Sequence, residues 1–146
     1  MMLALAWFLA GEDIALPEPV KTGGMPLMEA LAKRKTERSF DLSAKLPLQT
    51  VSDLLWAANG ISRPDGRRTA PTARNFQELE LGILLPEGAF LYDAKENKLI
   101  QRSAGANPAP AIVAIIWDTQ KQPQKTFAAV DAGFIGQPEC IVRLSN

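Results

Sequence analysis

Arg34, Lys35, Thr36 and Arg38 together carry the side chains that proteins use to hold a phosphate group. A guanidinium donates paired hydrogen bonds, an ammonium adds a point charge, and a hydroxyl adds a further donor. With Lys33, the stretch places four cations within six residues. A solvated helix end explains the same residues, because cations also interact favourably with the C-terminal helix dipole. The cluster alone therefore leaves both a phosphate site and an ordinary surface open.

A second constellation lies in residues 67–78, with the sequence RRTAPTARNFQE. Thr69, Thr72 and Asn75 offer neutral hydrogen-bonding groups, and Pro71 stiffens the backbone between them. Such groups can bind the edge of a planar heteroaromatic ring. The alternative is a polar surface loop.

The composition excludes several function classes. The chain of 146 residues is long enough for one domain with a core, and its 16 cations balance 16 anions. Although the loop region holds four arginines, the absence of interleaved aromatic residues and of overall basicity argues against nucleic acid as a partner. The chain has no His, which removes Ser-His-Asp and Cys-His catalysis and most zinc sites. With a single cysteine, redox chemistry would need a bound cofactor.

Metal and disulfide chemistry find no support in the sequence. Cys140 is the only cysteine and cannot form an internal disulfide. The carboxylates of Asp53, Asp65, Asp93 and Asp131 show no metal-ligand spacing, so we expect no metal site.

Residues 1–24 are predicted to form an apolar N-terminal segment and a linker. The apolar run of ten residues before Gly11 is too short for a stable membrane span. It resembles a clipped or weak secretory signal without the leading positive charges, and a buried or partner-covered segment is equally compatible. The compartment therefore stays open between cytoplasm and periplasm. Residues 16–26, rich in Pro and Gly, read as an extended linker.

Three helices are predicted. One covers about 26–34, and a second begins at Pro47 and stops at Asn59, with Gly60 free to take a positive φ. The third covers about 124–137 and ends at Pro138. One face of this helix is expected to carry four apolar residues: Phe127, Val130, Phe134 and Ile135.

The pattern between the second and third helices predicts β-strands. Residues 61–78 lack an apolar period and form a long loop. Residues 79–85 alternate between apolar and other side chains, and 89–94 and 98–102 complete an antiparallel meander. The apolar run 111–117 suits a strand covered on both faces. The element order predicts an α+β fold.

Three segments, in the right order, resemble the nitroreductase family of flavin enzymes. RKTERSF, residues 34–40, is similar to the family's Arg-Arg/Lys-Ser/Thr-x-Arg-x-Phe opening. The stretch 54–78 resembles the following helix and its Pro-Ser/Thr-x-x-Asn-x-Gln loop, and VDAGFIGQ, residues 130–137, resembles the start of the long central helix. The resemblance covers roughly residues 25–137.

This resemblance implies a nitroreductase-like FMN-binding α+β fold, with an antiparallel or mixed sheet flanked by helices, and an intertwined homodimer. The flavoprotein would pass hydride from NADH or NADPH through FMN to a nitroaromatic, quinone or related acceptor, with no catalytic protein side chain. By position, the phosphate and ribityl chain fall to Arg34, Lys35, Thr36 and Arg38. The loop that reaches the partner's flavin matches Pro71, Thr72, Ala73 and Asn75.

The sequence departs from the family pattern at its end. Relatives continue well beyond the central helix start, whereas residues 138–146 form an atypical tail. We therefore expect a fold incomplete at the C-terminus, from a truncated or frameshifted gene product. A catalytically weak remnant that still binds flavin or dimerises is the alternative to an active enzyme, and a plain interaction domain is the third possibility.

Overall fold

The computed structural model describes residues 12–39, 41–105 and 109–145, and the predicted signal-like run in residues 1–11 lies outside them. The described elements follow one another along the chain in this order: β1 (Ile14–Ala15), α1 (Leu27–Lys33), α2 (Leu48–Asn59), the 3-10 turn η1 (Ala73–Asn75), β2 (Leu79–Leu85), β3 (Gly88–Asp93), β4 (Lys98–Ala104), β5 (Ile112–Trp117) and α3 (Lys125–Ser145). The predicted α+β class is therefore confirmed.

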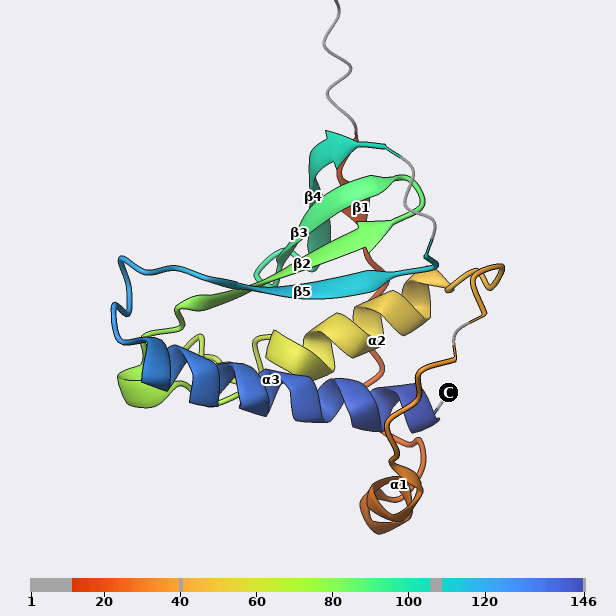
Figure 1. Ribbon diagram of the computed structural model, residues 1–146, viewed down its shortest axis with the longest axis horizontal. Helices are drawn as coiled ribbons and strands as arrows, with labels where there is room; N and C mark the ends of the chain where they lie inside the picture. The colour runs from red at the N-terminus through yellow and green to blue at the C-terminus, as the bar shows by residue number, and fades with distance from the viewer. Residues whose placement is uncertain (1–11, 40, 106–108, 146) are drawn as a thin grey trace, which may run out of the picture.

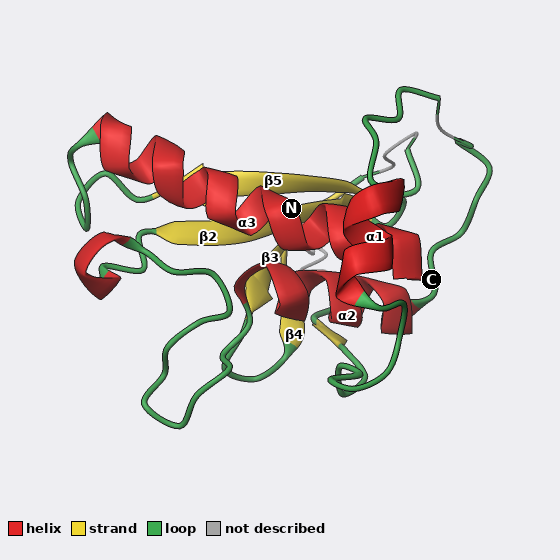
Figure 2. Ribbon diagram, turned by 90° about the horizontal axis from the view of Figure 1, so that it is seen from below, coloured by secondary structure: helices red, strands yellow, loops and turns green. Residues whose placement is uncertain are grey.

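The elements form two layers, a sheet above and three helices below it (Figure 1). The sheet has the order β1-β4-β3-β2-β5, and every pair of neighbouring strands is antiparallel. Seen from below, α2 and α3 lie side by side under the sheet and α1 lies further out (Figure 2). The core lies between the layers, where Leu55 of α2, Ile135 of α3 and Ile83 of β2 are fully buried.

The predicted meander is confirmed as β2, β3 and β4. Alternate residues of β2 face the helices, and all four are buried: Leu79, Leu81, Ile83 and Leu85. The prediction for residues 111–117 is wrong in one respect. β5 is an edge strand, and its Ile112 and Ile116 stay exposed, because no strand or helix in the described chain covers that side.

The end of α2 is confirmed at Asn59, but the predicted positive φ at Gly60 is wrong. Gly60 has φ −73° and ψ 162°, an extended conformation open to any residue. Glycine is needed for space instead. A Cβ at this position would lie 2.6 Å from the carbonyl oxygen of Trp56 and would also collide with the Trp56 ring.

The predicted end of the third helix at Pro138 is also wrong, since α3 continues to Ser145. Pro138 cannot donate a hydrogen bond to the carbonyl of Phe134, yet the apolar spacing continues beyond it. Ile141 and Val142 follow seven residues after Phe134 and Ile135, and a proline can kink a helix without ending it.

The four apolar residues predicted on one face of α3 divide between two faces. Ile135 is fully buried against the core with Ala128. Phe127, Val130 and Phe134 are 45%, 55% and 48% exposed and form a stripe that we call the outer stripe of α3. The described chain therefore leaves an apolar helix face uncovered.

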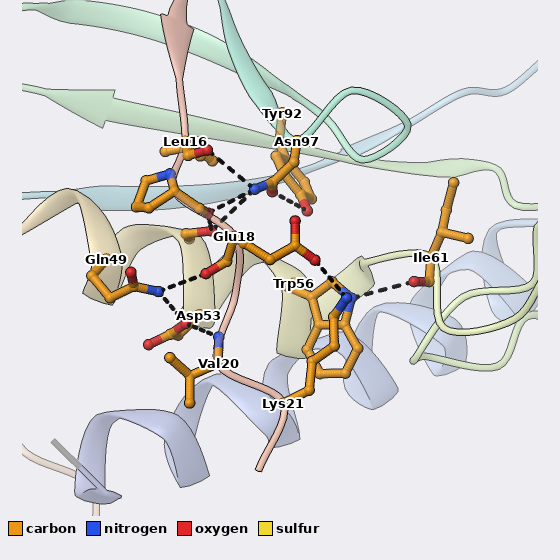
Figure 3. Close-up of polar contacts among 12 residues, drawn as sticks. Leu16, Glu18, Val20, Lys21, Gln49, Asp53, Trp56, Ile61, Tyr92 and Asn97 are labelled. Carbon is orange, nitrogen blue, oxygen red and sulfur yellow. Dashed lines mark hydrogen bonds and ion pairs between the residues drawn. The ribbon is translucent and has the colours of Figure 1, made fainter.

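The predicted linker packs onto the domain. β1 pairs with β4, and Leu16 is buried. The carbonyl of Pro17 accepts hydrogen bonds from Ser52 Oγ at 2.6 Å and Asn97 Nδ2 at 2.8 Å, within the network drawn in Figure 3. Further along, the Val20 N–H donates to Asp53 Oδ1 at 2.7 Å. Residues 14–20 are thus extended, as expected, but they belong to the packed fold.

We predict that Gly60→Ala lowers the free energy of unfolding by about 1–3 kcal/mol, because the added methyl must displace the Trp56 ring or the end of α2. Urea unfolding followed by tryptophan fluorescence measures the change. Gly133→Ala is the matched control, since a Cβ there meets nothing within 4 Å and helix propensity favours alanine. Equal stability of the two variants would contradict the packing argument.

Candidate functional site

The cationic segment that follows α1 is exposed along its whole described length. The Arg34 N–H donates to the Ala30 carbonyl at 3.0 Å and ends the helix. Lys35 Nζ lies 3.2 Å from Glu37 Oε2, and backbone N–H groups led by that of Ser39, with help from Lys35, lower the pKa of Glu37. Among the residues that the structure describes, no carboxylate pairs with Arg34 or Arg38. Both guanidinium groups are therefore available to an anion.

The loop from Thr72 to Gln77 has an unusual backbone. Arg74, Asn75 and Gln77 have φ values of 53°, 58° and 50°, the left-handed region that non-glycine residues rarely adopt. Each such residue costs on the order of 1 kcal/mol and persists only where its surroundings hold it. Strain of this kind is typical of functional loops, which makes the loop a candidate site on structural grounds.

One contact ties this loop to α3. The Ala73 N–H donates to Asp131 Oδ2 at 2.8 Å, and Asp131 is buried on the inner face of α3. Inside the loop, the Gln77 N–H donates to Thr72 Oγ1 at 3.1 Å. The loop shape is therefore fixed from α3 and from within.

Arg68 and Gln77 hold the other side of the loop. Arg68 Nε donates to Gln77 Oε1 at 3.3 Å, and another guanidinium nitrogen donates to the Asn59 carbonyl at 2.9 Å. Burial lowers the pKa of Arg68, which nonetheless stays charged because an arginine pKa starts so high. Gln77 Nε2 donates to the Gly66 carbonyl at 3.2 Å and to Asn75 Oδ1 at 3.2 Å. The loop is thus connected to the end of α2.

These contacts decide which predicted groups remain free for a ligand. The N–H of Ala73 and the hydroxyl oxygen of Thr72 already have partners inside the chain. The exposed ring of Pro71, the Thr72 hydroxyl as a donor, and the side-chain NH₂ of Asn75 remain. Thr69 instead donates to the Trp56 carbonyl at 3.2 Å and anchors the loop to α2.

Within one copy of the chain, the two predicted groups of site residues lie near opposite ends of helix α3. α1 and the cationic segment after it lie beside the C-terminal end of α3, whereas η1 lies near its first turns (Figures 1 and 2). A helix of 21 residues spans about 30 Å. Two shallow cavities of about 250 and 260 Å³ in the described chain contain none of the eight predicted residues. One copy of the described chain therefore does not bring the groups together.

Glu78 is the second buried carboxyl group at the loop. Its side chain is fully buried, and neither oxygen accepts a hydrogen bond from an N–H or hydroxyl donor in the described ranges. Burial raises its pKa above the ordinary 4.5, and the neighbouring Asp131 adds to the shift.

In the described residues, no three carboxyl or thiol groups gather as a metal site would require. No helix in those ranges is long and apolar enough to cross a membrane.

Both the fold and the amino-acid sequence of this chain are similar to those of a protein of known structure. A crystal structure of a putative nitroreductase from Ralstonia eutropha JMP134 is 33% identical in sequence and superposes with a TM-score of 0.84. The match covers 93% of this chain and 73% of that one. The chain belongs to the nitroreductase family. No family model matches the sequence, and no curated protein matches it.

Membership of the nitroreductase family supports an oxidoreductase. The roles of the eight predicted site residues stay predictions. The sequence reasoning missed Arg68, Glu78 and Asp131, and it quoted Gln77 only as part of a motif. A charged residue at the edge of a polar loop resembles any surface residue in sequence, so burial alone distinguishes Glu78. For Asp131, the helical spacing with Ala128 and Ile135 was an available signal that it faces the core.

We predict that Glu78→Gln stabilises this nitroreductase increasingly as the pH rises. A carboxyl group whose pKa is raised on folding contributes stability below its unfolded pKa near 4.5, and this contribution is lost as the pH rises through the folded pKa. The difference in unfolding free energy between variant and wild type should grow by up to about 1.4 kcal/mol per pH unit within that window. Urea titrations from pH 5 to about 8 measure it. Glu80→Gln, at a half-buried neighbour, should show no such trend, and a parallel trend in both would contradict the assignment to Glu78.

Proposed function

We propose that the protein is an FMN-dependent oxidoreductase that passes hydride from NADH or NADPH through the flavin to a nitroaromatic, quinone or related acceptor. One observation carries this proposal: the chain shares the nitroreductase fold and 33% identity with a solved relative. The unpaired guanidinium groups and the strained loop of this chain add independent support.

The cationic segment suits the phosphate of FMN. Arg34 and Arg38 present guanidinium groups that are free of carboxylates in the described chain, four residues apart, with Thr36 between them. Guanidinium groups bind phosphate oxygens through paired, charge-assisted hydrogen bonds. Lys35 contributes charge, although Glu37 offsets part of it. The donor set therefore fits a phosphate monoester better than it fits a neutral ligand.

A complete flavin site requires two copies of the chain. Arg34 and Asn75 belong to groups at opposite ends of α3, so a second, antiparallel copy would bring the loop of one to the cationic segment of the other. The outer stripe of α3 offers an apolar surface for that contact. Exposed apolar surface of this kind typically marks a protein–protein interface. We therefore assign the stripe to a homodimer.

The protein side chains bind and orient rather than react. FMN, when bound, would supply the hydride transfer itself. Arg34, Lys35, Thr36 and Arg38 would hold the phosphate and ribityl chain, and Asn75 would donate its free NH₂ hydrogens to the flavin of the partner. A chain without His has no imidazole for proton transfer near neutral pH, and this assignment needs none.

The proposal is tested on purified protein. Bound flavin is measured by absorbance after gentle purification, and turnover by NADH or NADPH oxidation with a quinone or a nitroaromatic acceptor. Flavin with turnover supports the enzyme. Flavin or dimerisation without turnover identifies the catalytically weak remnant instead, and colourless protein that ignores added FMN overturns both.

We predict that Arg34→Ala weakens FMN binding by about 1.5–3 kcal/mol, roughly 10- to 150-fold, through loss of charge-assisted hydrogen bonds. Fluorescence titration of apoprotein with FMN measures the dissociation constant. Arg63→Ala is the matched control, because Arg63 is an equally exposed arginine in the loop after α2. Equal affinities of both variants would remove the phosphate role.

We predict that Phe134→Glu shifts the protein toward monomer and lowers its flavin content together. An unpaired carboxylate buried in an apolar interface costs at least about 2 kcal/mol, which raises the dimer dissociation constant roughly 30-fold. Sedimentation velocity and flavin absorbance provide the two measurements. Gln120→Glu adds the same charge at an exposed turn before α3 and should change neither. A dimer that persists in the Phe134 variant would show that the outer stripe is not the interface.

A further inference from the structure

The buried carboxyl group of Glu78 accepts no hydrogen bond from an N–H or hydroxyl donor in the described chain. Glu78 follows the loop directly and lies immediately before β2, where the chain becomes buried. Both of its carboxyl oxygens are shielded from solvent. An ionised carboxylate without a partner costs several kcal/mol in such surroundings. Burial therefore shifts Glu78 toward the neutral acid, which carries a proton that it can donate.

Asp131 is the group that can accept a hydrogen bond from the protonated carboxyl group of Glu78. Only 3% of Asp131 is exposed, and its interaction with Glu78 helps to raise the pKa of Glu78. Its Oδ2 accepts the Ala73 N–H at 2.8 Å, which leaves acceptor capacity on the carboxyl group. Two buried carboxyl groups side by side cannot both ionise cheaply, so they tend to hold one proton between them.

The loop conformation depends on the contact with Asp131. Ala73 immediately precedes Arg74 and Asn75, two of the residues with positive φ. The Asp131 contact is the long-range hydrogen bond, across 58 positions of the sequence, that fixes the loop against α3. Without it, relaxation of Arg74 and Asn75 toward ordinary φ values would release strain, so the loop would move.

We propose that Glu78 and Asp131 form a carboxyl pair sharing one proton, and that this pair positions residues 72–77 for the ligand and releases them when the proton is lost. They are positioning residues, since they act through the backbone of Ala73. The inference rests on the proposed function, because it treats this loop as the part that reaches a flavin. The proton moves to solvent base as the pH rises and leaves two buried negative charges that repel each other.

The charges that face the pair come from two elements. Asp131 lies on α3, and Lys121 lies in the turn between β5 and α3, where it favours ionised Glu78. Lys121 is already shared, since its Nζ lies 3.7 Å from both Glu80 and Asp118. Asp118 donates its backbone N–H to the Glu78 carbonyl at 2.9 Å, so a backbone hydrogen bond joins the residues just before this turn to Glu78. Lys121 therefore lowers, but does not remove, the preference for one shared proton.

Amide hydrogen exchange of the flavin-free protein tests the pair directly. Mass spectrometry follows peptides covering 70–78, with rates corrected at each pH against the unfolded chain. In wild type, protection of the Ala73 amide should fall at least about tenfold between about pH 5 and pH 9, the equilibrium effect of one lost hydrogen bond to a charged group. In Glu78→Gln, an amide replaces the protonated acid, so protection should not depend on pH.

Glu80→Gln is the matched control and should follow wild type, because Glu80 is half-buried and paired with Lys121. Constant wild-type protection across this range, or an equal fall in Glu78→Gln, overturns the shared proton. The wild-type profile decides this even if a variant fails to fold. FMN titrations at the same pH values separate the two proposals: loss of Ala73 protection without FMN binding at any pH leaves the pair intact and removes the flavin function.

Discussion

The structure of the candidate site depends on one hydrogen bond, from the Ala73 N–H to Asp131 on α3. Three non-glycine residues with positive φ cost together about 3 kcal/mol or more. A hydrogen bond to a charged carboxylate contributes about 1.5–3 kcal/mol, and the bonds of Gln77 to Thr72 and Arg68 add about 1 kcal/mol each. The remaining bonds of Gln77, to the Gly66 carbonyl and to Asn75 Oδ1, add to this sum. The Asp131 bond is the largest single contribution, so its removal weakens the loop most.

The same helix carries two different surfaces, and each serves a different part of the proposed two-copy site. The inner face of α3 supplies Ala128, Asp131 and Ile135 to the core and to the loop, whereas its outer stripe stays apolar and uncovered. The exposed isoleucines of β5 add apolar surface at the sheet edge. A solitary copy would keep this surface in water at a cost of about 25 cal/mol per Å². The proposed homodimer would therefore use the same helix that positions the loop.

Regular elements could be predicted from the sequence because their periods are local. The alternation of Leu79 to Leu85 and the spacing of α2 each identify an element without any distant contact. The errors arose where steric limits or contacts outside the local pattern determine the conformation. Gly60 is required by the Trp56 ring rather than by its own φ, and Pro138 lies within a helix whose apolar spacing continues past it. The resemblance in three ordered segments indicated the family correctly, because it combined signals that were weak one by one.

The candidate site was less predictable, since its geometry depends on burial. The residue types in 34–38 made an anion site one of two interpretations, because clustered cations are visible in the sequence without any structure. Asn75 gives a weak signal, because asparagine tolerates positive φ better than most residues, but nothing in the local sequence shows that Arg74 and Gln77 adopt it. The contact that permits this conformation comes from Asp131, 58 residues later, whose carboxylate resembles a solvated one in a sequence. The most constrained part of the site is thus held by residues that a motif search would pass over, and the exposed residues of the loop, such as Asn75, depend on them for their positions.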